Sequence, residues 1–262
     1  MRTLLKPLQL LYFIYAICLF VLLMIPVFLW SLVVSFFGRI KGGNLVFRAC
    51  QVWADLWFAL IFIRQQNIFL EKPAPDQSYI FVVNHISYLD SAMIPKVFRM
   101  PVRPLGKVEM TKIPVFGTIY KNVIVTVDRS SAANRSKSVQ QLKATLRKGI
   151  SVLVFPEGTF NETGKPLKDF YDGAFRIAIE TGTPVMPVLF LDTFSRMPTH
   201  AVSALNPGRC RAVFLPSVSP NGYSLEEVAS YRTKVYQIME TALLNQNASW
   251  IAKGKEEDLR NV

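Results

Sequence analysis

A histidine and an aspartate five residues apart form the first candidate reactive pair in this sequence. His85 follows the apolar run 79–83, which predicts a buried strand, and Asp90 opens an apolar stretch that predicts a helix. A carboxylate in the first turn of that helix is able to reach back to the imidazole, fix its tautomer and stabilise its protonated form. The pair therefore predicts a general base. The spacing alone fits equally well a structural histidine beside a helix-capping aspartate.

A second polar turn makes the pattern more specific. Residues 151–155 predict another short buried strand, and Pro156-Glu157-Gly158-Thr159 follows it. In open α/β sheets, ligands bind at the carboxyl ends of the strands. The two strand-end motifs are therefore expected to meet at one edge of a sheet.

Asn84-His85 with Asp90, followed later by Phe155-Pro156-Glu157-Gly158-Thr159, resembles the 1-acylglycerol-3-phosphate acyltransferase family of membrane lysophospholipid acyltransferases. The resemblance covers roughly residues 66–216. It implies that His85 and Asp90 are catalytic and that a fatty acyl group passes from a thioester to the free hydroxyl of a lysophospholipid. The implied acceptor is 1-acyl-sn-glycerol 3-phosphate, giving phosphatidic acid. The implied donor is acyl-CoA or acyl-carrier protein, as a co-substrate, with no further cofactor.

The resemblance also implies how the acceptor headgroup is held. Lys107, in the segment 106–117, and Arg129, after the strand-like run 123–127, match the family's phosphate contacts. A guanidinium at a strand end offers a bidentate fork to a phosphate, although an ion pair with Asp128 is the structural alternative.

The turn after the second strand adds further candidates. Glu157 is expected to bind either the glycerol hydroxyls or a backbone amide, and the Gly158 amide is a candidate donor to an oxyanion. The complete set of expected substrate-binding residues is Asn84, Lys107, Arg129, Glu157, Gly158 and Thr159.

Two positions depart from the family pattern. Phe160 stands where the family usually has arginine, and the segment Phe170–Gly173 lacks the family's lysine. Arg176 in the next predicted helix is a candidate replacement. The departures keep open a different acceptor, such as a lyso-aminolipid or another lysophospholipid. A catalytically silent membrane scaffold is the alternative from another functional class.

Charge and composition indicate a membrane partner. The chain has 262 residues, 51% of them hydrophobic, a mean hydropathy of +0.27 and a net charge of +12. Residues 96–148 carry twelve basic and two acidic residues, which fits an anionic membrane surface or a phosphorylated substrate. Nucleic acid is not expected, because this segment has few interleaved aromatic residues. Three scattered cysteines predict no disulfide framework, and two histidines provide no metal-binding spacing.

The N-terminus predicts the membrane attachment. Residues 8–37 are almost uninterruptedly apolar, and as a helix they would span about 45 Å against a hydrocarbon core of about 30 Å. One tilted span or a re-entrant hairpin broken at Pro26 is expected, and basic residues on both flanks favour the hairpin. Gly42-Gly43-Asn44 predicts a break, and residues 45–63 predict an interfacial helix, with a core helix as the alternative. The expected location is the membrane, at the cytoplasmic face of the inner membrane if the chain is bacterial.

Alternation of strands and helices predicts an α/β fold with a mixed, mostly parallel sheet flanked by helices. Three parts are expected: the membrane helix or hairpin with its interfacial helix (1–65), the catalytic domain (66–250) and a charged tail (251–262). Strands are predicted near 66–70, 79–83, 101–106, 123–127, 151–155, 184–190 and 210–215. Helices are predicted near 89–98, 114–120, 135–148, 172–181 and 225–244.

Overall fold

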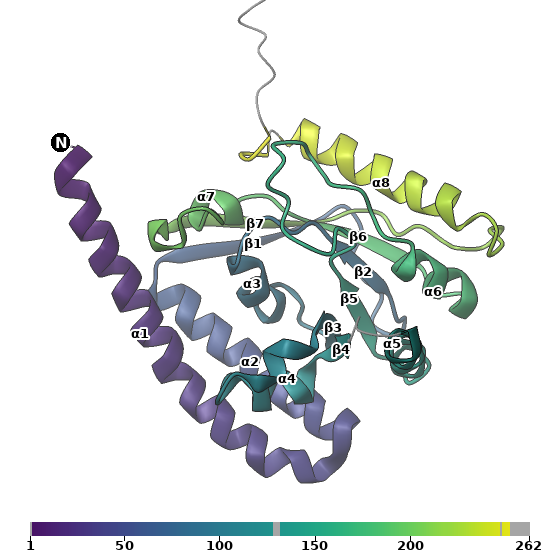
Figure 1. The fold of residues 1–262 in the computed structure, drawn as a ribbon, viewed down its shortest axis with the longest axis horizontal. Coiled ribbons are helices and arrows are strands. Elements are labelled where there is room, and N and C mark those ends of the chain that lie inside the picture. The colour runs from purple at the N-terminus through teal and green to yellow at the C-terminus, as the bar shows by residue number, and fades with distance from the viewer. Residues whose placement is uncertain (1, 128–131, 247, 252–262) are drawn as a thin grey trace, which may run out of the picture.

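A seven-stranded sheet forms the centre of the protein (Figure 1). The structure is a computed structural model that describes residues 2–127, 132–246 and 248–251. The strand order is β1-β7-β6-β2-β5-β3-β4, and all neighbours are parallel except β6 and β7. The mixed, mostly parallel sheet is therefore confirmed. The strands are β1 (Ile63–Phe69), β2 (Ile80–Val83), β3 (Val102–Lys107), β4 (Val125–Val127), β5 (Ser151–Val154), β6 (Val185–Phe190) and β7 (Gly208–Phe214).

The central strands are those with the clearest apolar runs. Every residue of β2, β5 and β6 is buried, as parallel strands covered on both faces require. Each of the seven predicted strands is present. The edge strand β1 begins three residues earlier than predicted, because its first half, Ile63-Arg64-Gln65-Gln66, is largely polar and carries little apolar signal.

Helices cover both faces of the sheet, and the side chains of β2 alternate between them. Ile80 and Val82 contact the core under α5 (Ala132–Leu146), α6 (Gly173–Thr181) and α8 (Val228–Asn245). Phe81 and Val83 contact the core under α2 (Gly38–Leu60), α3 (Leu89–Val97) and α4 (Phe116–Val123). The remaining short helical segments are Val108–Lys112, α7 (Thr193–Arg196) and Val202–Ala204.

The N-terminal segment is a long helical hairpin. Helix α1 (Arg2–Val34) and α2 lie side by side and run in opposite directions, as Figure 1 shows, joined by the 3-10 turn Ser35–Phe37. The ring of Phe20 contacts Trp53 and Trp57 edge-on, with centroids 4.8 and 5.3 Å away. The Trp57 indole donates to the carbonyl of Ala16 at 2.8 Å. These contacts hold the middle of α1 against the C-terminal half of α2.

The break predicted at Gly42-Gly43-Asn44 is absent, and of the two alternatives at Pro26 the unbroken helix is the one observed. Helix α1 continues through Pro26, and the chain reverses at Gly38, whose φ of +75° favours glycine. Gly42, Gly43 and Asn44 lie inside α2 and cause no break. A side chain at Gly43 would lie 2.6 Å from the carbonyl oxygen of Asn122, so glycine permits close approach of α2 to the end of α4. A glycine pair that serves helix packing gives the same sequence signal as a turn.

The hairpin and the sheet share one continuous core. Trp53, Trp57 and Phe58 of α2 belong to the same buried cluster as Phe81 of β2 and Phe214 of β7. The predicted N-terminal part is thus packed onto the domain through α2 and the middle of α1, and it includes the start of β1. Of the predicted charged tail 251–262, residues 252–262 lie outside the described residues.

The outer face of the hairpin remains apolar and exposed. Pro7–Leu60 is long and apolar enough to cross a membrane, with a mean hydropathy of 2.9 in its most apolar stretch. Leu22 and Leu29 of α1 are 61% and 55% exposed, and Val52 and Leu56 of α2 are also exposed. This apolar face is consistent with membrane association.

Candidate active site

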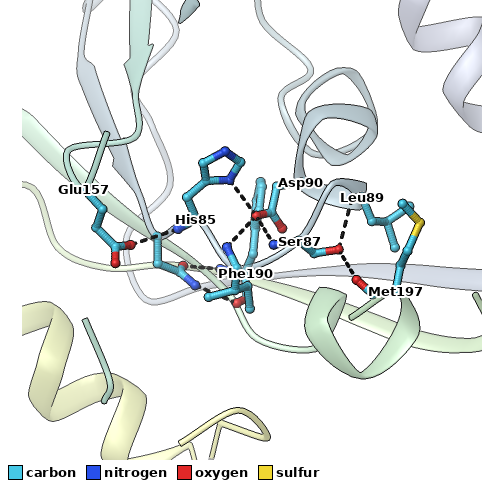
Figure 2. Close-up of polar contacts among 9 residues, drawn as sticks. His85, Ser87, Leu89, Asp90, Glu157, Phe190 and Met197 are labelled. Atoms are coloured by element: carbon cyan, nitrogen blue, oxygen red, sulfur yellow. Dashed lines mark hydrogen bonds and ion pairs between the residues drawn. The ribbon is translucent and has the colours of Figure 1, made fainter. Parts of the chain in front are cut away.

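The two sequence motifs meet at one edge of the sheet. Val82 of β2 lies beside Val154 of β5 in parallel register, so His85 and Glu157, each three residues further along, leave the sheet together. The backbone N–H of His85 donates to Glu157 Oε1 at 2.9 Å. Figure 2 shows this contact beside the histidine–aspartate pair.

His85 and Asp90 form the predicted hydrogen-bonded pair. His85 Nδ1 lies 2.9 Å from Asp90 Oδ2, and the same oxygen accepts the backbone N–H groups of Ile86 and Ser87 at 2.8 and 2.9 Å (Figure 2). Asp90 is fully buried in the first turn of α3, where the helix N-terminus favours a negative charge. A carboxylate oxygen that already accepts two backbone N–H groups is an acceptor for Nδ1–H. The pair therefore leaves the Nε2 lone pair free to take a proton.

Aromatic rings enclose the imidazole. Phe155 stacks on His85 with centroids 4.0 Å apart and planes 16° apart, and Phe160 contacts the ring at 4.2 Å and 53°. Tyr88 packs edge-on against Phe160 at 4.6 Å. The position where the family usually has arginine therefore supplies an apolar wall beside the histidine.

The Glu157 carboxylate accepts hydrogen bonds from two backbone N–H groups. Its Oε1 accepts the His85 N–H and its Oε2 accepts the Lys168 N–H, both at 2.9 Å. The backbone-amide hypothesis for Glu157 thus describes the contacts observed. Burial raises the pKa of Glu157 to about 7, although the hydrogen bonds from Lys168 and His85 oppose this shift. Glu157 links the two motifs and fixes the backbone at His85.

Replacing Glu157 with glutamine is expected to lower kcat about tenfold or more, because a buried backbone N–H would then face an amide NH2 group.

The structure also predicts that this substitution changes the pH dependence of folding stability. Glu157 keeps its proton to a higher pH in the folded state than its ordinary pKa of 4.5 allows, so the parent loses stability as pH rises from 4.5 to about 7. The variant should lose less over this range in denaturant titrations. Exposed Glu162 in the same loop provides the control Glu162→Gln, and a Glu157→Gln enzyme with parental kcat would contradict this role.

Asn84 has a different environment from the one predicted. Its side chain is fully buried, its Nδ2 donates to the Phe190 carbonyl at 3.0 Å, and its Oδ1 accepts the Phe190 N–H at 2.8 Å. These two bonds join the ends of β2 and β6 and leave Asn84 no exposed polar group for a substrate.

The Ser87 hydroxyl is also buried. It donates to the carbonyl of Met197 and accepts the N–H of Leu89. Its hydroxyl is therefore not poised as a nucleophile.

The other predicted binding residues differ in position. The Gly158 N–H donates to the Phe155 carbonyl within the turn, at 3.1 Å, so the proposed oxyanion donor is already engaged. Thr159 is exposed beside it. Lys107 is exposed at the end of β3, two strands from β2 at the same sheet edge. Arg129 lies outside the described residues. Arg176 pairs with Glu180 on the exposed surface of α6 at 3.6 Å.

Two residues at the site were missed from the sequence. Asn161 is buried, and its N–H donates to the His85 carbonyl at 2.7 Å. The Lys168 ammonium lies 2.5 Å from Thr159 Oγ1. Both belong to the loop after the second motif, and only its folding back onto His85 brings them to the site. A polar loop of this kind has no periodic signal that would identify them.

Comparison with known proteins finds similarity to acyltransferases. Residues 64–191 match the family model described as Acyltransferase. The 1-acyl-sn-glycerol-3-phosphate acyltransferase of Chlamydomonas reinhardtii is 31% identical over 63% of this chain and 48% of its own length, so this chain spans about half of that relative. The enzyme of that name from Salmonella typhimurium is 30% identical over 64% of this chain and 69% of its own length.

A solved structure resembles the whole described fold. The crystal structure of the 1-acyl-sn-glycerophosphate acyltransferase PlsC from Thermotoga maritima superposes with a TM-score of 0.71 at 24% identity. The match covers 95% of this chain and 99% of the other. At this identity the likeness supports the fold, including the mixed sheet and the N-terminal helices.

Proposed function

The chain belongs to the acyltransferase family, and on that premise we propose that it acylates the free hydroxyl of 1-acyl-sn-glycerol 3-phosphate, giving phosphatidic acid. The observation that carries the proposal is the His85–Asp90 pair, whose free Nε2 lies among aromatic rings at the sheet edge. Two relatives that are 30–31% identical to this chain bear the name of this activity. The donor we propose is an acyl thioester, either acyl-CoA or acyl-carrier protein.

The geometry supports direct transfer. His85 Nε2 takes the proton of the acceptor hydroxyl as its oxygen attacks the thioester carbonyl, and Asp90 stabilises the imidazolium that forms. The carbon–sulfur bond then breaks, and the thiolate takes the proton back from the imidazolium. The products are phosphatidic acid and the free thiol of the donor. Ser87 is engaged in two hydrogen bonds, so it is no candidate for an acyl-enzyme step.

The test is an assay of purified protein with one labelled acyl thioester and a panel of lyso-lipid acceptors. Lysophosphatidate is expected to give the highest kcat/KM. A second acceptor class is favoured by one observation: Phe160, Phe155 and Tyr88 place an aromatic wall around His85. Such a wall suits an acceptor with a larger or less charged headgroup. A higher kcat/KM for a lyso-aminolipid or another lysophospholipid would replace lysophosphatidate as the acceptor.

We further propose that the hairpin anchors the enzyme at the membrane that holds its acceptor. The exposed apolar face of α1 would lie among lipid chains, and Lys107, Lys112 and Lys121 would face anionic headgroups. A donor made in the cytosol requires the active site on that side. For a bacterial chain this is the cytoplasmic face of the inner membrane.

Replacing Leu22 and Leu29 together with asparagine is expected to weaken partition into anionic vesicles at least about tenfold, because each exposed leucine would lose its burial in lipid. The matched control replaces Leu225 and Leu244 with asparagine in the same way. These two leucines are 47% and 51% exposed and lie outside the hairpin. Sedimentation with vesicles measures both, and the unfolding temperature in detergent should be equal for both. Equal partition of the two double variants would contradict insertion of this face.

A further inference from the structure

The loop after the second motif is fixed to the active site. Asn161 is 1% exposed, and its backbone N–H donates a hydrogen bond to the carbonyl oxygen of His85. Its Nδ2 donates to the Lys165 carbonyl at 2.9 Å, and its Oδ1 accepts the N–H and hydroxyl of Thr163. These hydrogen bonds therefore attach the loop to the active site, and they fix the positions of the residues at its far end.

Lys168 lies at that far end and contacts the site twice. Its backbone N–H donates to Glu157 Oε2, while the other oxygen of Glu157 accepts the His85 N–H. Its ammonium donates to Thr159 Oγ1 at 2.5 Å and lies 3.5 Å from the Phe160 carbonyl oxygen. The ring of Phe160 in turn contacts the His85 imidazole. The charged group of Lys168 thus lies beside the backbone of Phe160, whose ring forms part of the aromatic wall around the catalytic histidine.

This charge is not neutralised by an ion pair. None of the ion pairs between described residues includes Lys168, and both acceptors of its ammonium are uncharged oxygens. The Lys168 charge favours the ionised form of Glu157, but both oxygens of Glu157 accept backbone N–H groups and neither forms an ion pair with the ammonium. An ammonium has three donors, so one remains for a further acceptor. A partly buried cation of this kind is favoured where an anion joins it.

We propose that the Lys168 ammonium binds the phosphate of the acceptor and sets the preference for a phosphate-bearing lyso-lipid. This inference rests on the proposed function, since it assigns a headgroup contact in that reaction. Phe160 stands at the family's arginine position, and the segment Phe170–Gly173 lacks the family's lysine. Lys168 supplies a cation to the same neighbourhood from a different point in the loop.

The experiment compares three variants in the lysophosphatidate assay. Lys168→Gln keeps a donor for Thr159 but removes the charge, Lys168→Arg keeps the charge, and Lys165→Gln removes an exposed charge from the same loop. We expect Lys168→Gln to raise the KM for lysophosphatidate about tenfold or more with kcat within about threefold, since a charged contact made equally in ground and transition states is lost. Lys168→Arg should restore a KM near that of the parent, and Lys165→Gln should match the parent.

The outcomes separate this inference from the proposed function. A fall in kcat without a rise in KM would show that Lys168 acts through Glu157 and His85, and it would overturn the phosphate contact. Parental kinetics for Lys168→Gln would also overturn it, while leaving the acyltransferase activity intact. A parent enzyme that does not acylate lysophosphatidate would contradict the proposed function itself, and the Lys168 inference with it.

Discussion

Replacing His85 with alanine is expected to lower kcat by about 10²–10⁴-fold, the usual contribution of a positioned general base. The imidazole is held by Asp90 through Nδ1, which leaves Nε2 as the atom that removes the acceptor proton. The substitution removes that atom and leaves the backbone contacts of residue 85 with Glu157 and Asn161 in place. Membrane partition and the unfolding temperature should change little.

Initial rates with saturating donor and lysophosphatidate measure this effect. The matched control is His200→Ala, the chain's other histidine, whose ring contacts Phe194 and makes no described contact with His85. A His85→Ala enzyme with activity within threefold of the parent would refute the assignment of the base.

Asp90→Asn is expected to lower kcat by about 10- to 150-fold, the value of one charged hydrogen bond. Asp90 Oδ2 accepts all three hydrogen bonds, while the buried Oδ1 has no partner among the described residues. An asparagine is therefore able to keep its oxygen at the Oδ2 position and place its NH2 group at the Oδ1 position. The tautomer of His85 would be preserved, and the negative charge that stabilises the imidazolium would be lost.

This geometry separates a chemical effect from a structural one. The KM values for donor and acceptor should stay near those of the parent, because the lost interaction strengthens only as the imidazolium forms. The far-ultraviolet circular dichroism spectrum should be unchanged. A variant that loses its fold, or that raises KM while keeping kcat, would show that Asp90 only shapes the loop.

The sequence predicts the sheet and the reactive pair because both depend on short-range patterns. Residues 80–83 and 151–154 are apolar without interruption, and each run is followed at once by polar residues. Parallel strands place such ends at one edge, so His85 and Glu157 were expected to meet and do. The family resemblance rests on these same residues.

Other features depend on contacts that no local pattern contains. Asn84 pairs with Phe190, more than a hundred residues away in the chain, so the sequence gives no sign that its side chain is fully used. Lys168 reaches the site only because the loop folds back onto His85. Pro26 lies inside a continuous helix, because Met24 and Val27 beside it are buried in the core and the loss of one N–H donor is tolerated.

Direct transfer to the acceptor is the central claim, and one mixing experiment tests it. Purified protein is mixed with a labelled acyl thioester, with and without lysophosphatidate, and label is measured in the denatured protein and in phosphatidic acid. The account predicts no acyl-protein under either condition, and labelled phosphatidic acid only when lysophosphatidate is present. Label that accumulates on the protein without acceptor and then moves into phosphatidic acid would contradict it.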